Sequence, residues 1–72
     1  MKTYILEAES NRDVGELLIA LGADIATLSL VCSGPDGVDV TFTSSLPTAS
    51  IQQAIAGIVD GHAMLRTLKV KF

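Results

Sequence analysis

Basic side chains are scarce in this chain. Its 72 residues hold five lysines and arginines against eight aspartates and glutamates, a formal net charge of −3. Binding to the phosphates of a nucleic acid requires a cluster of basic side chains, and the five present here are scattered along the chain. We therefore expect no nucleic-acid partner and, by the same charge argument, no membrane partner.

Cysteine and long apolar runs are equally scarce. The only cysteine, Cys32, excludes an internal disulfide. No apolar run approaches the roughly 20 residues of a membrane-spanning helix. Residues 1–4 lead straight into a strand pattern, without the apolar segment of a secretory signal peptide. We therefore expect a cytoplasmic protein.

Side chains that could carry catalysis or bind a metal are few. Nucleophilic catalysis needs a nucleophile beside a base, and the only histidine, His62, lies far along the chain from Cys32. Metal sites need clustered ligands, but the first predicted loop, residues 9–13, contains no sulfur. We expect no enzymatic activity, no cofactor and no bound metal, and we assign no role to Cys32 or His62.

Apolar residues, in contrast, are abundant. They make up 49% of the chain and charged residues 18%, the opposite of the composition of disordered chains. A chain of this length forms one domain, so we expect a single domain over residues 1–72. Because so small a domain buries only about 60% of its unfolded surface, we also expect apolar surface that one small core does not cover.

The first part of the chain predicts a strand followed by a helix. Residues 2–8 alternate in the manner of a strand. Apolar residues recur at helical spacing over residues 11–21, where Ser10 is suited to cap the start and Gly22 to end the helix in a left-handed conformation. A shorter helix capped by Asp13 is an alternative that leaves barely two turns.

The middle of the chain predicts a hairpin. Residues 25–32 and residues 38–43 both alternate in the strand pattern, and the sequence Ser-Gly-Pro-Asp-Gly at 33–37 is typical of a tight turn. The remainder predicts a helix over residues 47–59 that ends before Gly61, and a last strand over residues 66–72.

The predicted order of elements is βαββαβ. Right-handed crossovers then place both helices on one face of the sheet. We therefore expect an α+β fold, a ferredoxin-like sandwich with a four-stranded antiparallel sheet of order 4-1-3-2 and two helices on one face. The expected core consists of Leu17, Leu21, Leu28, Leu30, Val40, Phe42, Ile51, Ile55, Ile58, Leu68 and Val70. The open face presents Thr3, Ile5, Thr41 and Thr43, without the aromatic side chains on which RNA bases stack.

One stretch of the sequence resembles a known family. Residues 17–25, Leu-Leu-Ile-Ala-Leu-Gly-Ala-Asp-Ile, resemble the helix of ACT domains that ends in Gly-(Ala/Ile)-(Asn/Asp)-Ile and leads into the second strand, and residues 65–70 resemble the family's last strand. ACT domains are small regulatory modules that bind amino acids. Residues 33–36 are also similar to a Thr-Gly-x-Asp hairpin in the ligand-sensing domain of leucine-responsive regulators.

The resemblance implies a non-enzymatic regulatory module that binds a small amino acid. It points to ligand-binding residues in the first turn and at the start of the second strand: Ser10, Asn11, Arg12, Ala23 and Asp24. The residues leave two alternatives open, a structural or protein-interaction subunit without a small ligand and, third, a small enzyme. A larger protein partner is therefore open as well.

Two uncharged surfaces predict self-association. In the order 4-1-3-2 the second and fourth strands are the sheet edges; the fourth carries Lys69 and Lys71, but no charge lies between Asp24 and Asp36. Natural proteins protect exposed edges with charge or proline. The second helix lies within residues 40–59, which are also uncharged. We expect a homodimer or higher homo-oligomer with interface residues Thr27, Ser29, Val31, Ala49, Gln53 and Ala56.

Overall fold

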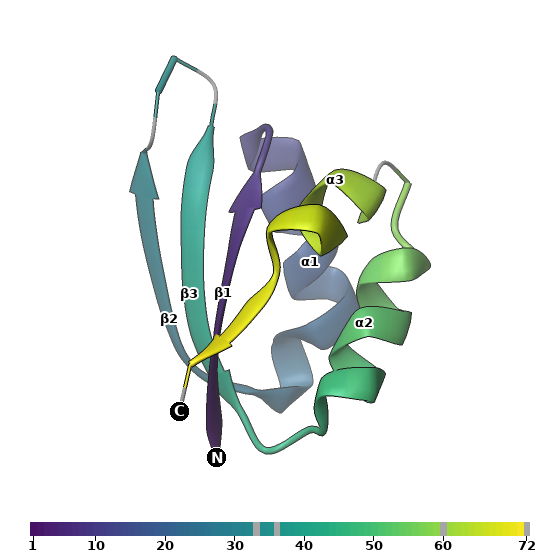
Figure 1. The fold of residues 1–72 in the computed structure, drawn as a ribbon. Coiled ribbons are helices and arrows are strands. Elements are labelled where there is room, and N and C mark those ends of the chain that lie inside the picture. The colour runs from purple at the N-terminus through teal and green to yellow at the C-terminus, as the bar shows by residue number, and fades with distance from the viewer. Residues whose placement is uncertain (33, 36, 60, 72) are drawn as a thin grey trace.

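The protein is an α+β structure in which helices cover one face of a sheet (Figure 1). The computed structural model describes residues 1–32, 34–35, 37–59 and 61–71. Within these residues it contains four strands, three α-helices and one short 3-10 helix. The predicted turn residues Ser33 and Asp36 and the predicted strand end at Phe72 lie outside the described residues.

The sheet is antiparallel throughout. Its strands are β1 (Lys2–Ala8), β2 (Ile25–Cys32), β3 (Val38–Ser44) and β4 (Lys69–Lys71). They lie in the order β2-β3-β1-β4, with β2 and β4 at the two edges. Read from the β4 edge, the order is 4-1-3-2.

The first helix, α1 (Asn11–Leu21), begins as the sequence predicts. The hydroxyl of Ser10 accepts a hydrogen bond from the Asp13 N–H at 3.3 Å, which confirms Ser10 and not Asp13 as the N-cap. The predicted left-handed end is wrong, because Gly22 has right-handed helical angles, φ −52° and ψ −39°. The chain instead continues into the 3-10 helix η1 (Gly22–Asp24), which leads directly into β2.

The second half of the chain differs from the prediction. The expected helix over 47–59 is shorter, α2 (Thr48–Ala56), and the expected two helices are three. Gly61 begins α3 (Gly61–Thr67), which occupies the start of the expected strand 66–72 and leaves only three residues to β4. Gly61 is buried against α2, where an added Cβ would collide with the Ile55 carbonyl oxygen. None of the described helices is long and apolar enough to cross a membrane.

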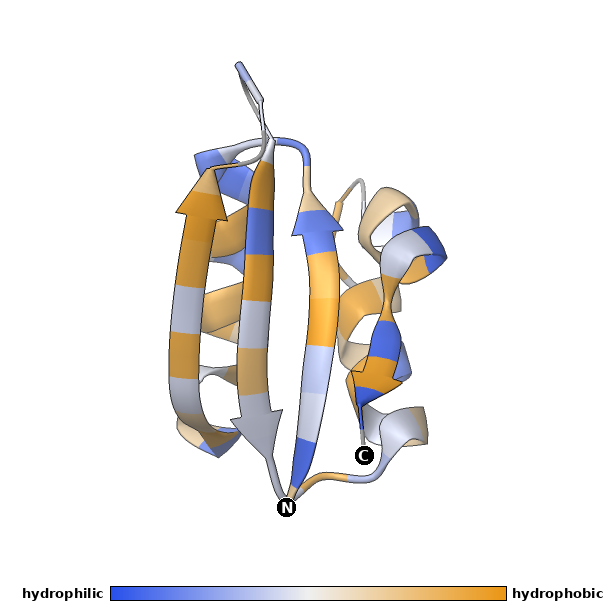
Figure 2. Ribbon diagram, turned by 60° about the vertical axis from the view of Figure 1, so that its left-hand side comes forward, coloured by the Kyte–Doolittle hydropathy of each residue, from blue (hydrophilic) through white to orange (hydrophobic). Residues whose placement is uncertain are grey.

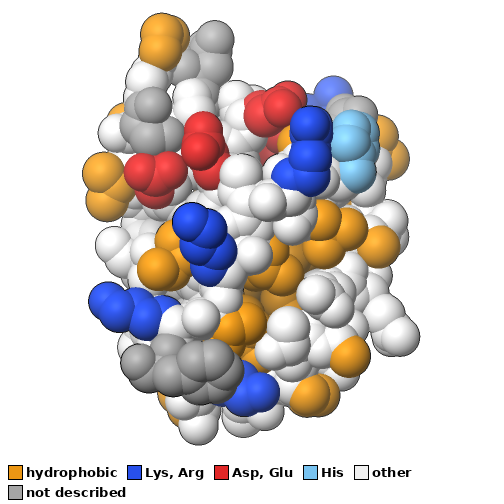
Figure 3. Space-filling view, viewed as in Figure 1, with side chains coloured by type: hydrophobic (Ala, Val, Ile, Leu, Met, Phe, Trp, Pro, Cys, Tyr) orange, Lys and Arg blue, Asp and Glu red, His pale blue; other side chains and the backbone are white. Residues whose placement is uncertain are grey.

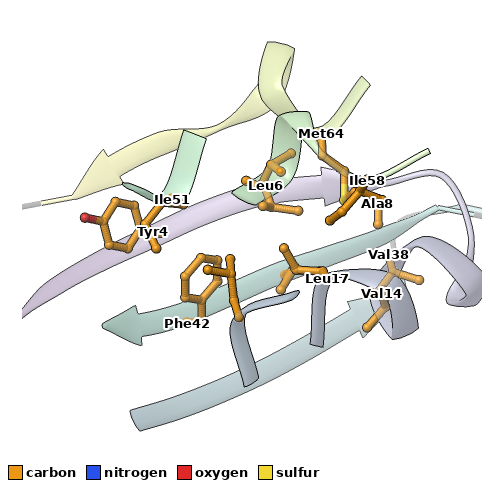
Figure 4. Packing of buried hydrophobic residues seen from close by; sticks show 13 residues of the cluster. Tyr4, Leu6, Ala8, Val14, Leu17, Val38, Phe42, Ile51, Ile58 and Met64 are labelled. Atoms are coloured by element: carbon orange, nitrogen blue, oxygen red, sulfur yellow. The ribbon is translucent and has the colours of Figure 1, made fainter. Parts of the chain in front are cut away.

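The core lies between the sheet and the helices (Figure 4). The rings of Tyr4 and Phe42 stack within it with centroids 5.4 Å apart, and the Tyr4 hydroxyl donates to the Leu46 carbonyl at 2.7 Å. Met64 of α3 is fully buried in the same core. The core therefore includes a side chain from a third helix, whereas the sequence predicted a core covered by two helices.

Two of the expected core residues are exposed. Leu28 and Leu30 of β2 keep 40% and 47% of their surface exposed. Their cross-strand partners on β3, Phe42 and Val40, are fully buried. Leu68 and Val70 are only partly buried, whereas the other seven expected residues are buried. The alternation on β2 was predicted correctly, but an edge strand has a neighbour on one side only, so its apolar side chains are less covered.

Candidate ligand site at the start of α1

The turn from β1 to α1 and the hairpin between β2 and β3 meet at one end of the molecule (Figure 1). Between them lies an open hollow of about 670 Å³. Figure 3 shows acidic side chains gathered at this same end. The described residues that line the hollow are Glu9, Ser10, Asn11, Arg12, Asp13, Cys32, Gly34, Pro35, Gly37 and Val38.

The register of the hairpin fixes one wall of the hollow. Cys32 is the cross-strand partner of Val38, and directly opposed residues of an antiparallel pair point to the same face of the sheet. Val38 is buried in the core beneath the helices. The side chain of Cys32 therefore lies on the helix-covered face, toward the start of α1, where it is exposed and unbonded to another cysteine.

The start of α1 supplies positive potential. The first amides of a helix have no partner within the helix and carry a partial positive charge that attracts anions. Here the amides of Asp13 and Val14 are already bonded, to Ser10 Oγ and Ser10 O, so they contribute to the dipole but are not free to bind a ligand. The side chain of Arg12 is exposed beside them and lines the same hollow. This wall of the hollow suits a carboxylate or another small anion.

Two carboxylates supply the opposite charge. Glu9 is exposed, whereas Asp13 is only 8% exposed. No buried side-chain oxygen of the described residues lacks a hydrogen-bond partner, so the Asp13 carboxylate is not an orphaned buried group. It lies in the first turn of α1, where the helix dipole favours a negative charge.

The structure brings together some of the predicted ligand residues. Ser10, Asn11 and Arg12 line the hollow. Ala23 and Asp24 do not, since they lie in η1 at the opposite end of α1. Sequence reasoning missed Glu9, Asp13 and Cys32. The Ser10 cap predicted correctly that Asp13 lies in the first turn of α1. No pattern in the sequence indicated that the β2–β3 hairpin would bring Cys32 to the same hollow.

The predicted interface residues of β2 lie at the sheet edge and on its open face. Thr27, Ser29 and Val31 are all exposed, and Val31 keeps 59% of its surface. Thr27 Oγ1 lies 2.7 Å from Thr43 Oγ1 of β3, so the open face is hydrogen-bonded across the two strands. Figure 2 shows that β2 carries no strongly hydrophilic residue along its length, unlike β1, β3 and β4.

The predicted interface residues of α2 lie elsewhere. Ala49, Gln53 and Ala56 are exposed and line a second, more open hollow of about 500 Å³ together with Gln52 and Leu65. Figures 1 and 2 both show α2 on the side of the molecule away from β2. The two uncharged surfaces are therefore separate. A dimer with a single two-fold interface buries only one of them.

The remaining chemistry-bearing residues are dispersed. In the part of the chain that the structure describes, no group of three or more His, Cys, Asp or Glu side chains could hold a metal ion. His62 lies in α3, which packs on β1, whereas Cys32 ends the edge strand β2. The two therefore do not form a nucleophile–base pair.

Comparisons with protein-family models, with curated proteins and with solved structures gave no match. The assignment of a function therefore depends on the hollow and surfaces of this chain.

Proposed function

We propose that the chain is a non-enzymatic regulatory module that binds a small amino acid and acts as a homodimer. The observation that carries the proposal is that both signs of charge, Arg12 and the carboxylates of Glu9 and Asp13, line the hollow at the start of α1. We also propose an ACT-like domain on the ferredoxin-like plan, with α3 as an addition to it.

An amino acid matches this arrangement because it carries both charges on neighbouring atoms. Its carboxylate fits the start of α1, where backbone amides and the Arg12 guanidinium favour an anion. Its ammonium group can donate to the carboxylates of Glu9 and Asp13, which line the same hollow. A ligand with only one of the two charges leaves half of the hollow unsatisfied.

The homodimer part of the proposal concerns the edge of β2. The strand Ile25–Cys32 has no charged residue, and in a two-fold antiparallel pair it meets its own sequence, so no like charges are brought together. Such pairing extends the sheet across the two copies and covers the exposed Leu28 and Leu30. Two-fold dimers are the commonest protein oligomers.

The same pairing accounts for the two predicted ligand residues that are missing from the hollow. In an antiparallel pair, the end of β2 in one copy lies beside the start of β2 in the other. The segment that precedes that start is η1, which contains Ala23 and Asp24. The hollow of each copy is then completed by these residues of its partner.

A second candidate is a protein-interaction subunit without a small ligand. The outer face of α2 favours it, because surface helices normally carry charges there and this helix has none. The hollow beside it, between Ala49, Ala56 and Leu65, is lined by small, uncharged and apolar side chains.

A thermal-shift screen against the amino acids separates the two candidates. Binding to the native state at a hundred times Kd stabilises it by about 2.7 kcal/mol, and each kcal/mol raises the Tm of so small a domain by about 4–8 °C. We expect at least one amino acid to raise the Tm of the wild type. The shift should be lost in Arg12→Gln and Asp13→Asn, each compared with its own ligand-free Tm.

Arg66→Gln is the matched control, because Arg66 is an exposed arginine of α3 outside the hollow at the start of α1. It should keep the full shift. If no amino acid raises the Tm of the wild type, ligand binding is refuted and the interaction subunit is favoured. A shift that survives both Arg12→Gln and Asp13→Asn places the ligand elsewhere and also refutes the proposal.

A further inference from the structure

The edge strand β2 has a free side, and its backbone hydrogen-bonding groups alternate between that side and β3. The N–H of Thr27 donates to Thr43 Oγ1 of β3 at 3.1 Å, so it points toward β3. In a strand, the N–H and C=O of one residue point to one side and those of the next residue to the other. The backbone groups of Ser29 therefore also point to β3, and those of Leu28 and Leu30 point to the free edge.

We propose that a second copy of the chain pairs with this edge in one register, with the two-fold axis at Ser29. The inference rests on the homodimer part of the proposed function and adds the register in which the two copies meet. In an antiparallel ladder, the two residues of a hydrogen-bonded pair present their backbone groups to each other. Near the middle of β2, the axis can therefore lie at Leu28, Ser29 or Leu30, and not between two residues.

The irregular start of β2 disfavours an axis at Leu28. The register between β2 and β3 shifts between Ile25 and Thr27, so the regular part of the strand is 27–32. An axis at Leu28 sets the irregular residues 25 and 26 opposite residues 31 and 30 of the other copy. Because a bulge disrupts the ladder locally, this register loses pairing on both sides of the axis.

The exposed apolar side chains favour the axis at Ser29. It sets Leu28 of each copy opposite Leu30 of the other, so the two leucines that keep 40% and 47% of their surface exposed cover each other twice. On the open face it sets Thr27 opposite Val31, which is 59% exposed. Only Ser29, a small polar residue, then meets its own copy.

The remaining axis, at Leu30, gives poorer contacts. It sets Leu28 opposite Cys32 and Val31 opposite Ser29, which is a smaller partner in both cases. Only Leu30 then meets another leucine. Since cross-strand side-chain pairs are the unit of sheet stabilisation, the axis at Ser29 is the more stable of the two.

The same register has a consequence for the hollow at the start of α1. Continued past the strand, it sets Asp24 of one copy opposite Gly34 of the other, and Ala23 opposite Pro35. Gly34 and Pro35 line the hollow. Each copy thus brings its η1 to the hollow of the other.

Cysteine substitutions in a Cys32→Ser background test the register. Thr27, Ser29 and Val31 occupy non-hydrogen-bonded positions, where opposed Cα atoms are about 4.5 Å apart, within the roughly 4.4–6.8 Å range of a disulfide. Under mild oxidation, Ser29→Cys should form a disulfide between two copies, seen as a dimer on a non-reducing gel. The control is Gln53→Cys, at an exposed position of α2. Because pairing holds the two thiols together, we expect the Ser29→Cys disulfide to form about tenfold faster or more.

Mixtures of variants distinguish the three registers. Thr27→Cys and Val31→Cys should each react at the control rate alone and rapidly once mixed and allowed to exchange subunits. A rapid disulfide between residues 27 and 29 instead places the axis at Leu28, and one between residues 29 and 31 places it at Leu30. Either result overturns the inference, and so does the absence of any disulfide above the control rate.

The mass of the reduced variants separates this inference from the proposed function. If the reduced chains have the mass of a monomer at tens of micromolar, the homodimer itself is refuted, and the register with it. A dimer without the rapid Ser29→Cys disulfide refutes the register alone. Amino-acid binding is measured separately, by the thermal-shift screen, and its failure leaves the register unaffected.

Discussion

β2 and β3 lie side by side and follow the same alternation, yet they differ in what covers them. Phe42 of β3 is fully buried, while its cross-strand partner Leu28 on β2 keeps 40% of its surface exposed. The strand β3 is flanked by β1 and β2, whereas β2 has one free edge. The comparison teaches that alternation fixes the side to which a side chain points, while position in the sheet decides how far it is buried.

The two edges of the sheet differ as well. β4 presents Lys69 and Lys71, which oppose the approach of another strand. β2 is longer and has neither a charge nor a proline. A free edge of this kind invites pairing with another strand, which is the basis of our proposal that a second copy of the chain pairs with it.

The largest effect is expected in the cross-strand pair of Phe42 on the central strand β3 and Leu28 on the edge strand β2. Phe42→Ala should cost about 3–5 kcal/mol of unfolding free energy, because it empties a fully buried position. Leu28→Ala in dilute, monomeric protein should cost only about 1 kcal/mol, roughly half the value of a fully buried leucine. Urea unfolding measures both. Equal costs would show that β2 is packed as tightly as β3.

The next largest change in stability is expected at two glycines, one buried and one exposed. Gly61→Ala should cost about 1–3 kcal/mol or more, since the new methyl group meets the Ile55 carbonyl inside the fold. Gly22→Ala, at the exposed approach to β2, is the control: an added Cβ meets nothing within 4 Å and the backbone is right-handed, so stability should rise by about 0.4–1 kcal/mol. Thermal melts measure the Tm of both variants against the wild type. If Gly61→Ala has the Tm of the wild type, the close contact between α2 and α3 is wrong.

A smaller effect is expected at the helix start. Ser10→Ala removes the acceptor for the Asp13 amide and should cost about 1 kcal/mol. Ser10→Thr, which keeps the hydroxyl, should restore most of this in the same urea titration. A Ser10→Ala variant as stable as the wild type would contradict the cap and favour a helix that starts later.

The smallest effect on stability is expected for a variant that should change assembly. Thr27→Lys with Ser29→Lys places two charges on the exposed β2 edge and removes the hydroxyl contact of Thr27 with Thr43. Because this contact is exposed, the loss of unfolding free energy should be about 0.5 kcal/mol, the low end of the range for a hydrogen bond. We expect this variant to sediment as a monomer. The matched control, Gln53→Lys with Ala56→Lys on α2, should remain a dimer. The reverse pattern would move the contact to α2.

The sequence predicted the first four elements well because each had a local signal. β1, α1, β2 and β3 have the predicted bounds to within one residue, and the Ser10 cap was correct. α3 (Gly61–Thr67) was missed because Gly61 was interpreted as the end of the preceding helix and because residues 66–72 alternate like a strand. The burial of Met64 and the close approach of Gly61 to Ile55 are tertiary features. Local periodicity cannot report a contact of that kind.

The candidate site was predicted in part for the same reason. Ser10, Asn11 and Arg12 belong to one turn, so sequence proximity was enough to group them. Cys32 reaches that turn only through the pairing of β2 with β3. The burial of Asp13 depends on the same packing and has no signature in the composition of the segment.

The mass of the wild-type chain in solution tests most directly whether a second copy covers β2. Light scattering on the purified protein at tens of micromolar should give about twice the 7.5 kDa of one chain. The lysine pair on β2 should then return it to the mass of one chain. A wild-type protein of 7.5 kDa at that concentration would contradict the account, because the exposed edge would then have no partner.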